Sequence, residues 1–287
     1  MPNRIIAIDC SSPIINILND LLGNAITLES LSFKEVKGLK DYRMIILQEM
    51  NEKPDLFLKQ VRRLRYACHF KNIPIIIFRV NGNKGSIEPF ITAGATEVIS
   101  LQDPPAAVGQ ILSGHLIPNR QPLKEETGYI NSFVKNTCTV LKTVASLDVS
   151  FEEVYFDNDF KIFGDVSGLI ALTGGAEGIL GITFYWPLAQ TIIARMMGTD
   201  EDKINAEFIH DGVAEIVNMI GGSTKKDFVG QPNHFEISLP SVIVGSGHQL
   251  GHADRTPIAV LIFRVGSQYF AVQVCLKPEP NRKNNGN

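Results

Sequence analysis

The sequence predicts two domains, an N-terminal α/β domain with a doubly wound parallel sheet and a C-terminal α+β domain with a largely antiparallel sheet. Three observations predict this division. The chain of 287 residues is long enough for about two domains of ordinary size. Apolar strand-like runs alternate with helical runs over 1–118, whereas 129–280 follows the order helix, strands, helices, strands. The charge also differs, because residues 1–118 carry 13 basic and 11 acidic side chains (net +2) and the remainder 14 and 19 (net −5).

The first half alternates strands with helices. An apolar run over 4–8 ends at Asp9, and Ser11, Ser12 and Pro13 then open a helical pattern that extends to residue 22. Further strands are predicted at 44–47, 73–78 and 97–100, and further helices at 54–66, 87–93 and 105–116. Strands that are apolar along their whole length are typical of a parallel sheet covered on both faces. We therefore predict a doubly wound domain over 1–118.

The second half follows a polar segment, 119–128, which contains Pro122 and is preceded by Pro118, and which predicts an interdomain linker. Apolar residues at helical spacing predict an amphipathic helix over 129–145. Two more helices are predicted, one beginning at Trp186-Pro187 and ending at Gly198, and a longer one over 200–221. Strands are predicted at 151–156, 163–172, 178–185, 235–239, 241–244, 257–265 and 269–276. The polar tail 281–287 is predicted to be disordered.

Composition excludes several classes of protein. No apolar run approaches the roughly 20 residues that span a bilayer, and the start of the chain has no secretory signal, so we expect a cytoplasmic protein with no membrane partner. The net charge of −3 does not suit a nucleic-acid binder. The dense cluster Arg62-Arg63-Leu64-Arg65 is interpreted as a solvated helix face, or else as a docking patch. The cysteines are widely spaced and predict neither a disulfide framework nor a zinc site, and we expect most of them to be reduced and buried: Cys10, Cys68, Cys138 and Cys275.

Three segments of the first half resemble the receiver domain of response regulators (CheY-like): Arg4 to Asp9, Ile73 to Phe78 and Gly94-Ala95-Thr96-Glu97. The resemblance implies a site made of an acidic pair for Mg²⁺, a phosphoacceptor Asp, a hydroxyl residue and a Lys. This sequence departs from that pattern at most of those positions. The acidic pair is reduced to Asp9-Cys10, the acceptor position falls on Gln48, the hydroxyl position on Arg79, and the Lys position near Leu101.

These replacements remove the chemistry of a receiver. An amide does not form an acyl phosphate, and a Mg²⁺ site without two carboxylates loses its hard ligands. We therefore expect a degenerate receiver that is not phosphorylated and that serves as a structural or dimerising module. Glu49 is a candidate to join Asp9 in an acidic cluster.

The long helix carries the most informative spacing. At 100° per residue, five apolar side chains fall on the side that faces the core: Ile209, Val213, Ile216, Val217 and Ile220. The opposite side carries Asp211, Glu215, Asn218 and Gly222, followed by Ser223, Thr224, Lys225 and Lys226. Glu215 and Asn218 are three residues apart, so they project together. On spacing alone, a solvated helix face is the more common explanation of this pattern.

The string from Glu215 to Gly222, with its Glu-x-x-Asn and following Gly, resembles the signature of the CheX/CheC/FliY phosphatases. More of 129–276 agrees with the CheX order: Ser167-Gly168, Gly178-Ile-Leu-Gly181, Met196-Met-Gly198 and Leu239-Pro-Ser-Val-Ile-Val-Gly245. The resemblance implies hydrolysis of the aspartyl phosphate of a separate response regulator in a chemotaxis or two-component pathway. It further implies that Asn218 positions the attacking water and that Glu215 pairs with the substrate's Lys. Asp211, Gly222, Lys225 and Lys226 are candidate docking residues.

The same resemblance sets the remaining expectations. No cofactor of the chain's own is expected, because the substrate receiver supplies Mg²⁺. A homodimer is expected, as in CheX-like proteins. CheC proteins carry a second Glu-x-x-Asn on their first helix, but the comparable string here is Phe133-Val-Lys-Asn136, so one site per chain is expected. The alternative function is a non-catalytic adaptor that binds response regulators through the same helix face.

Three weaker signals carry no predicted site. The glycine-rich segment 245–252 has the wrong spacing for a nucleotide-binding loop and is predicted to be a loop between antiparallel strands. His248 and His252 do not form a convincing metal site there, so no metal is expected. Ser167 has no His/Asp arrangement near it in the sequence, so we find no nucleophilic triad.

Overall fold

The computed structural model describes residues 4–23, 26–36, 39, 42–68, 73–80, 85–116, 128–157, 162–250 and 258–278. The chain divides into two compact units, Met1–Pro118 and Asn119–Asn287. All but the last residue of the predicted linker 119–128 lies outside the described residues, as does the predicted tail 281–287.

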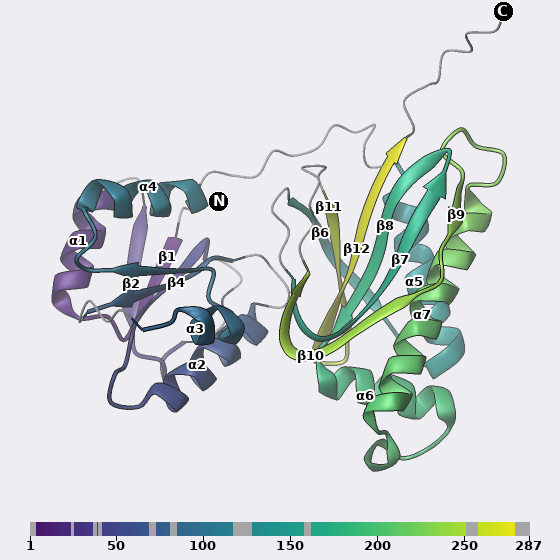
Figure 1. The fold of residues 1–287 in the computed structure, drawn as a ribbon, viewed down its shortest axis with the longest axis horizontal. Coiled ribbons are helices and arrows are strands. Elements are labelled where there is room, and N and C mark those ends of the chain that lie inside the picture. The colour runs from purple at the N-terminus through teal and green to yellow at the C-terminus, as the bar shows by residue number, and fades with distance from the viewer. Residues whose placement is uncertain are drawn as a thin grey trace, which may run out of the picture. The chain divides into compact units, whose positions relative to one another are not determined.

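The first unit is a five-stranded parallel sheet between helices (Figure 1). Its elements are, in chain order, β1 (Arg4–Ile8), α1 (Ser12–Leu22), β2 (Thr27–Leu31), β3 (Met44–Gln48), α2 (Pro54–Ala67), β4 (Ile75–Arg79), α3 (Glu88–Ala93), β5 (Glu97–Ser100) and α4 (Pro105–Leu116). The strand order β2-β1-β3-β4-β5 is the doubly wound order found in CheY. The predicted α/β class is therefore confirmed.

Alternation along the strands supplies two separate cores, one on each face of this sheet. Ile6 and Ile8 pack into the cluster that includes side chains of α2 and α3. Ile5 and Ala7, which alternate with them, pack into the cluster that includes side chains of α1 and α4. Apolar side chains of the strands thus line both faces of the sheet, and helices cover both faces, as the sequence predicted for a parallel sheet.

Strand β2 was missed by the sequence analysis. It lies at the edge of the sheet, and polar Thr27, Glu29 and Ser30 interrupt the apolar run that marks a buried strand. Its contacts with the rest of the unit are partly ionic. Glu29 accepts hydrogen bonds from Arg4 on β1 and from the hydroxyl of Tyr42, both at 2.7 Å. An edge strand needs only one paired side, so its signal in the sequence is weak.

The second unit packs three long helices on a seven-stranded sheet (Figure 1). Its elements are α5 (Ile130–Ala145), β6 (Ser150–Asp157), β7 (Ile162–Gly174), β8 (Ala176–Phe184), α6 (Trp186–Met197), the 3₁₀ turn η2 (Glu201–Lys203), α7 (Ala206–Asp227), β9 (Phe235–Ile237), β10 (Ser241–Leu250), β11 (Ile258–Val265) and β12 (Gln268–Pro278). The strand order is β10-β7-β8-β12-β11-β6, with β9 also paired to β7. All these pairs are antiparallel, so the predicted α+β class is confirmed.

The long helix differs from its predicted span of 200–221. It begins at Ala206 because the side chain of Asn205 accepts a hydrogen bond from the backbone N–H of Phe208 at 2.9 Å. It continues to Asp227, six residues beyond the predicted end. Gly221 does not end the helix, because it lies where the helix approaches the sheet, and a Cβ there would be 3.4 Å from Leu180.

Two strands of the second unit, β9 and β10, also differ in length from the prediction. β9 ends at Ile237 instead of 239, and β10 runs to Leu250 instead of 244. The predicted loop at 245–252 is therefore wrong as far as Leu250, although the pairing of β10 with β7 is irregular between Val244 and His248. Glycines at 245 and 247 suit such an irregularity in the strand. The same glycines are the reason that the sequence pattern predicted a loop here.

Candidate functional site

Helix α7 is held firmly against the sheet. Its five predicted core residues are all fully buried: Ile209, Val213, Ile216, Val217 and Ile220. The helix lies very close to β7, because a Cβ added at Gly168 would be 3.0 Å from Val213 and from Val217. A helix anchored in this way is a rigid support for the side chains on its other face.

The opposite face of α7 carries the polar residues that the sequence singled out. Asp211 and Glu215 are exposed, and Asn218 and Gly222 are half-buried. Glu215 and Asn218 are one turn apart on the same side. The structure therefore brings these four residues together on one helix face, as their spacing indicates.

Glu215 and Asn218 have no partner among the residues that the structure describes: neither side chain makes a hydrogen bond or an ion pair there. An ionised carboxylate offers only acceptor oxygens, whereas an amide offers both an acceptor oxygen and donor N–H groups. The pair can thus bind a cationic group and a water molecule without first breaking an internal contact.

The residues that follow this pair are placed differently. Lys225 forms an ion pair with Glu236 on β9, so its charge is partly engaged within the unit. Lys226 is exposed. Thr224 is fully buried, so the prediction that it supports the exposed face is wrong. Because the helix continues beyond its predicted end, Thr224 lies within its last turns, on the side that faces the core.

The comparable asparagine on α5 is tied down. Asn136 is 7% exposed, and its amide donates hydrogen bonds to the backbone oxygen of Ser132 at 2.8 Å and to Asp227 at 2.9 Å. Phe133, which stands in the place of a glutamate, is fully buried in the core. Helix α5 therefore offers neither the carboxylate nor a free amide.

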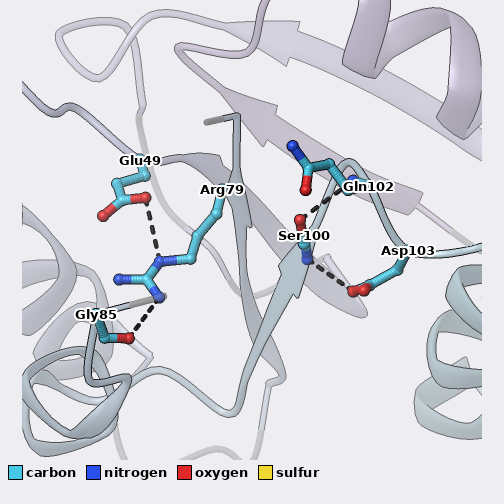
Figure 2. Close-up of polar contacts among 6 residues, drawn as sticks. All are labelled: Glu49, Arg79, Gly85, Ser100, Gln102 and Asp103. Atoms are coloured by element: carbon cyan, nitrogen blue, oxygen red, sulfur yellow. Dashed lines mark hydrogen bonds and ion pairs between the residues drawn. The ribbon is translucent and has the colours of Figure 1, made fainter. Parts of the chain in front are cut away.

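In the first unit, Arg79 fills the end of the sheet where a receiver would be phosphorylated (Figure 2). Its Nε donates to Glu49 Oε2 at 3.2 Å, and the side chains of both residues are 9% exposed. A second guanidinium nitrogen donates to the backbone oxygen of Gly85 at 2.8 Å, and the guanidinium carbon lies 5.1 Å from the centre of the Phe90 ring. Glu49 thus pairs with Arg79, and the suggested cluster of Glu49 with Asp9 stays a prediction.

The other receiver positions are also engaged. Gln48 Oε1 accepts a hydrogen bond from the backbone N–H of Ser11 at 2.7 Å, and Asp9 accepts one from the N–H of Phe33 at 3.3 Å. Past β5, Ser100 and Asp103 form a turn in which the Ser100 N–H donates to Asp103 at 2.9 Å (Figure 2). A carboxylate, a thiol and an amide do not fit Mg²⁺, which prefers several oxygen ligands with carboxylates among them.

Cys10, next to Asp9, is held as a neutral thiol. Burial, and to a smaller extent the negative charge of Asp9, raise its pKa from 9.0 to about 12. Burial likewise raises the pKa of Cys138. None of the four cysteines forms a disulfide within the described residues; Cys68 and Cys275 are buried, and Cys10 and Cys138 are half-buried. Among the described residues, no group of three or more His, Cys, Asp or Glu side chains is placed to hold a metal.

The arginine cluster of α2 is not a uniform solvated face. Arg62 and Arg63 are exposed, but Arg65 is 7% exposed and donates to the backbone oxygens of Gly94 and Ile73, both at 2.9 Å. Gly94 has a φ of 113° and leaves room for Arg65, because a Cβ there would lie 2.7 Å from the Cβ of Arg65. Arg65 is thus a structural residue that joins α2 to the loop after α3.

Ser167 also has a partner that the sequence did not reveal. His248 Nε2 lies 2.8 Å from Ser167 Oγ, and His248 Nδ1 lies 2.9 Å from the backbone oxygen of Gly245. Ser167 is fully buried and also bonds Thr183 at 2.7 Å. A buried hydroxyl in such a network holds strands together and is not an accessible nucleophile. The partner was missed because it lies 81 residues away, in the segment predicted as a loop.

Fold and site together define a two-domain protein in which a receiver-like α/β unit precedes an α+β unit with an unpaired Glu and Asn on one helix. The family model that matches residues 166–264 is described as chemotaxis phosphatase CheX. A CheC-like chemotactic protein from Shewanella oneidensis MR-1 is 33% identical over 53% of this chain and 99% of its own, with a TM-score of 0.46. Chemotaxis protein CheX from Vibrio vulnificus is 31% identical over 52% and 99%, with a TM-score of 0.48.

A CheX–CheY–BeF₃–Mg²⁺ complex from Borrelia burgdorferi is also similar, at 16% identity over 52% of this chain and 97% of its own, with a TM-score of 0.46. Among curated proteins, none matches the chain. With identities above 30% over nearly the whole length of two relatives, the chain belongs to the CheX family through its second unit.

Proposed function

We propose that the second unit hydrolyses the aspartyl phosphate of a response-regulator receiver carried by another protein. The observation that carries this proposal is the pair Glu215 and Asn218, exposed and half-buried on one face of a rigid helix and unpaired within the described residues. Membership in a family described as chemotaxis phosphatases agrees with this reaction. We expect the circuit to be chemotaxis or a related two-component pathway.

In the proposed reaction Asn218 orients the attacking water. Its side-chain oxygen accepts a hydrogen bond from the water, while its N–H groups donate to the substrate. Phosphoryl transfer to water depends mainly on in-line placement and on stabilisation of spread charge, so a neutral amide that fixes the water is sufficient. The water attacks phosphorus, the P–O bond to the substrate's aspartate breaks, and inorganic phosphate leaves. No covalent intermediate forms on this chain.

Glu215 positions the helix on the substrate. Its carboxylate pairs with the lysine of the receiver's own site, which sets the register of α7 and places Asn218 one turn further on. The receiver also supplies Mg²⁺, so this chain needs no metal. Asp211, Gly222, Lys225 and Lys226 are proposed to line the same contact, with Lys225 already paired to Glu236.

The substrate is proposed to be another protein because the first unit lacks the groups of a phosphorylated receiver. Gln48 stands at the acceptor position, and the Arg79–Glu49 pair stands where the hydroxyl residue would act. We propose that this unit is a pseudo-receiver with a structural role. The homodimer and the cytoplasmic location stay predictions; no helix in the described part of the chain is long and apolar enough to cross a membrane.

The proposal is tested by a phosphatase assay on every receiver domain encoded in the same genome, each loaded with acetyl phosphate. Wild-type chain is expected to speed the loss of phosphate from at least one of them, and Asn218→Ala is expected to remove that acceleration. If no receiver loses phosphate faster but one of them binds, the chain is an adaptor, and the enzymatic proposal fails.

A further inference from the structure

The turn between β9 and β10 presents a leucine to solvent. Leu239 is 89% exposed, more than any other large hydrophobic side chain of the described residues. Single exposed leucines are common on protein surfaces and need no explanation by themselves. Leu239 differs from such residues in two ways: its backbone is held rigidly, and it lies close to the proposed site.

The backbone of the turn is held by Ser238. Its N–H donates to the backbone oxygen of Ala171 on β7, and its hydroxyl accepts from the N–H of Ala171, both at 3.0 Å. The same hydroxyl donates to the backbone oxygen of Leu239 at 2.9 Å. Leu239 is therefore exposed on a fixed turn. A side chain held out in this way loses little conformational freedom when a partner covers it.

This turn flanks the side of α7 that carries the proposed site. Ile237, two residues before Leu239, lies against Gly222. A Cβ added at Gly222 would be 3.9 Å from Ile237 Cδ1. Glu236 forms its ion pair with Lys225 of the same helix. Helix α7 runs beside β9 and β10, and Gly222 is one turn beyond Asn218 (Figure 1). The β9–β10 turn therefore follows directly on the strand that packs beside Gly222.

We infer that Leu239 is a substrate-docking residue that packs against the phosphorylated receiver when the receiver engages Glu215 and Asn218. The inference rests on the proposed function and extends its contact surface from α7 to the β9–β10 turn. Interfaces combine a few apolar anchors with polar groups around them, and Leu239 supplies the apolar anchor beside a polar helix face. It has no group that acts on water, so it contributes to binding and not to the chemical step.

The test compares wild-type chain, Leu239→Asp and Val154→Asp on the receiver that wild type dephosphorylates fastest. Val154 is a matched control, because it is 39% exposed on β6, at the opposite edge of the sheet from β10. We expect Leu239→Asp to raise KM about tenfold, which corresponds to about 1.4 kcal/mol of binding, and to leave kcat within about twofold. Val154→Asp should leave both unchanged. Thermal unfolding checks that each variant is folded.

Binding of the same receiver, loaded with BeF₃⁻ and Mg²⁺, separates this inference from the proposed function. A tenfold weaker Kd for Leu239→Asp supports the docking role; if wild type proves inactive, the receiver that it binds most tightly takes the place of the fastest substrate in this measurement. If wild type dephosphorylates the receiver and Leu239→Asp has the KM and Kd of wild type, the inference is overturned and the proposed function stands. A variant that only changes its oligomeric state would assign Leu239 to a contact between two copies, which also overturns the inference.

Discussion

At the scale of single residues, two carboxylates on α7 differ in their expected roles. Glu207 and Glu215 are both exposed on this helix, two turns apart. Only Glu215 lies one turn from Asn218, on the side with Gly222. A conservative substitution at each position therefore separates docking from general surface charge.

We predict that Glu215→Gln raises the KM for the phosphorylated receiver about tenfold, because it removes the charge that pairs with the substrate's lysine and keeps the shape of the side chain. Glu207→Gln should leave KM unchanged. Steady-state release of phosphate measures both. Equal KM values for the two variants would contradict the role of Glu215.

Cys10 should be chemically inert in the folded chain. Its pKa of about 12 keeps it a neutral thiol at pH 8, and the thiolate is the form that reacts. The raised pKa arises first from burial, which is lost on unfolding, and then from the charge of the adjacent Asp9. We expect iodoacetamide at pH 8 to alkylate Cys10 far more slowly in the native chain than in guanidinium, as measured by mass spectrometry of the peptide. Equal rates in the two conditions would contradict this environment.

Residue types predicted the polar helix face better than they predicted the pairs between distant segments. Glu215 and Asn218 could be placed together because helical spacing is local information. The partners of Arg65 and of Ser167 could not be predicted, since Gly94 and His248 are brought to them by the packing of the whole unit. The pairing of Arg79 with Glu49 likewise depends on the register of two adjacent strands.

At the scale of elements, two glycines serve different purposes, one on the strand that packs against the buried face of α7 and one on α7 itself. Gly168 of β7 lets the helix approach the sheet, whereas Gly222 has open space beside it apart from the end of Ile237. A glycine inside a helix costs stability relative to alanine. Its presence at Gly222 is explained if a partner needs to come close at this point.

We predict that Gly222→Ala makes the chain more stable and the phosphatase weaker. Alanine stabilises the interior of a helix by about 0.5–1 kcal/mol relative to glycine, while the added methyl group hinders the close approach of the receiver and raises KM. The matched control is Gly114→Ala in α4, where a Cβ meets nothing within 4 Å. It should stabilise the first unit without changing KM. An unchanged KM for Gly222→Ala would remove Gly222 from the docking surface.

Most elements could be predicted from the sequence because their apolar periods are clear. The exceptions are instructive. The edge strand β2 lacks a continuous apolar run, and α7 passes through two glycines that usually favour an end. The far part of β10 is glycine-rich but still pairs with β7. In each case tertiary contacts outweigh the local preference of the residues.

At the scale of the whole molecule, each unit has its own hydrophobic core: one in the second unit and two, on opposite faces of the sheet, in the first. We assign a substrate-binding helix to the second unit and no phosphorylation chemistry to the first. The two assignments are independent, because one rests on α7 and the other on the carboxyl ends of β1, β3 and β4.

We predict that the chain itself takes up no covalent phosphate when incubated with acetyl phosphate and Mg²⁺. Gln48 has no carboxylate to form an acyl phosphate, and Arg79 and Glu49 neutralise each other at the neighbouring strand end. Intact-mass measurement checks this, with an ordinary receiver labelled in parallel as the positive control. A base-labile phosphate on the first unit would show that it is a working receiver.

The central claim is that Asn218 positions the attacking water, and a single-turnover rate tests it most directly. The chain, in excess over a purified phosphorylated receiver, binds all of the substrate, so the rate of phosphate loss reports the chemical step alone. We predict that wild type accelerates this loss and that Asn218→Ala lowers the accelerated rate at least about a hundredfold, because the water is no longer held in line. Equal rates for wild type and Asn218→Ala, with both bound to the receiver, would contradict the account.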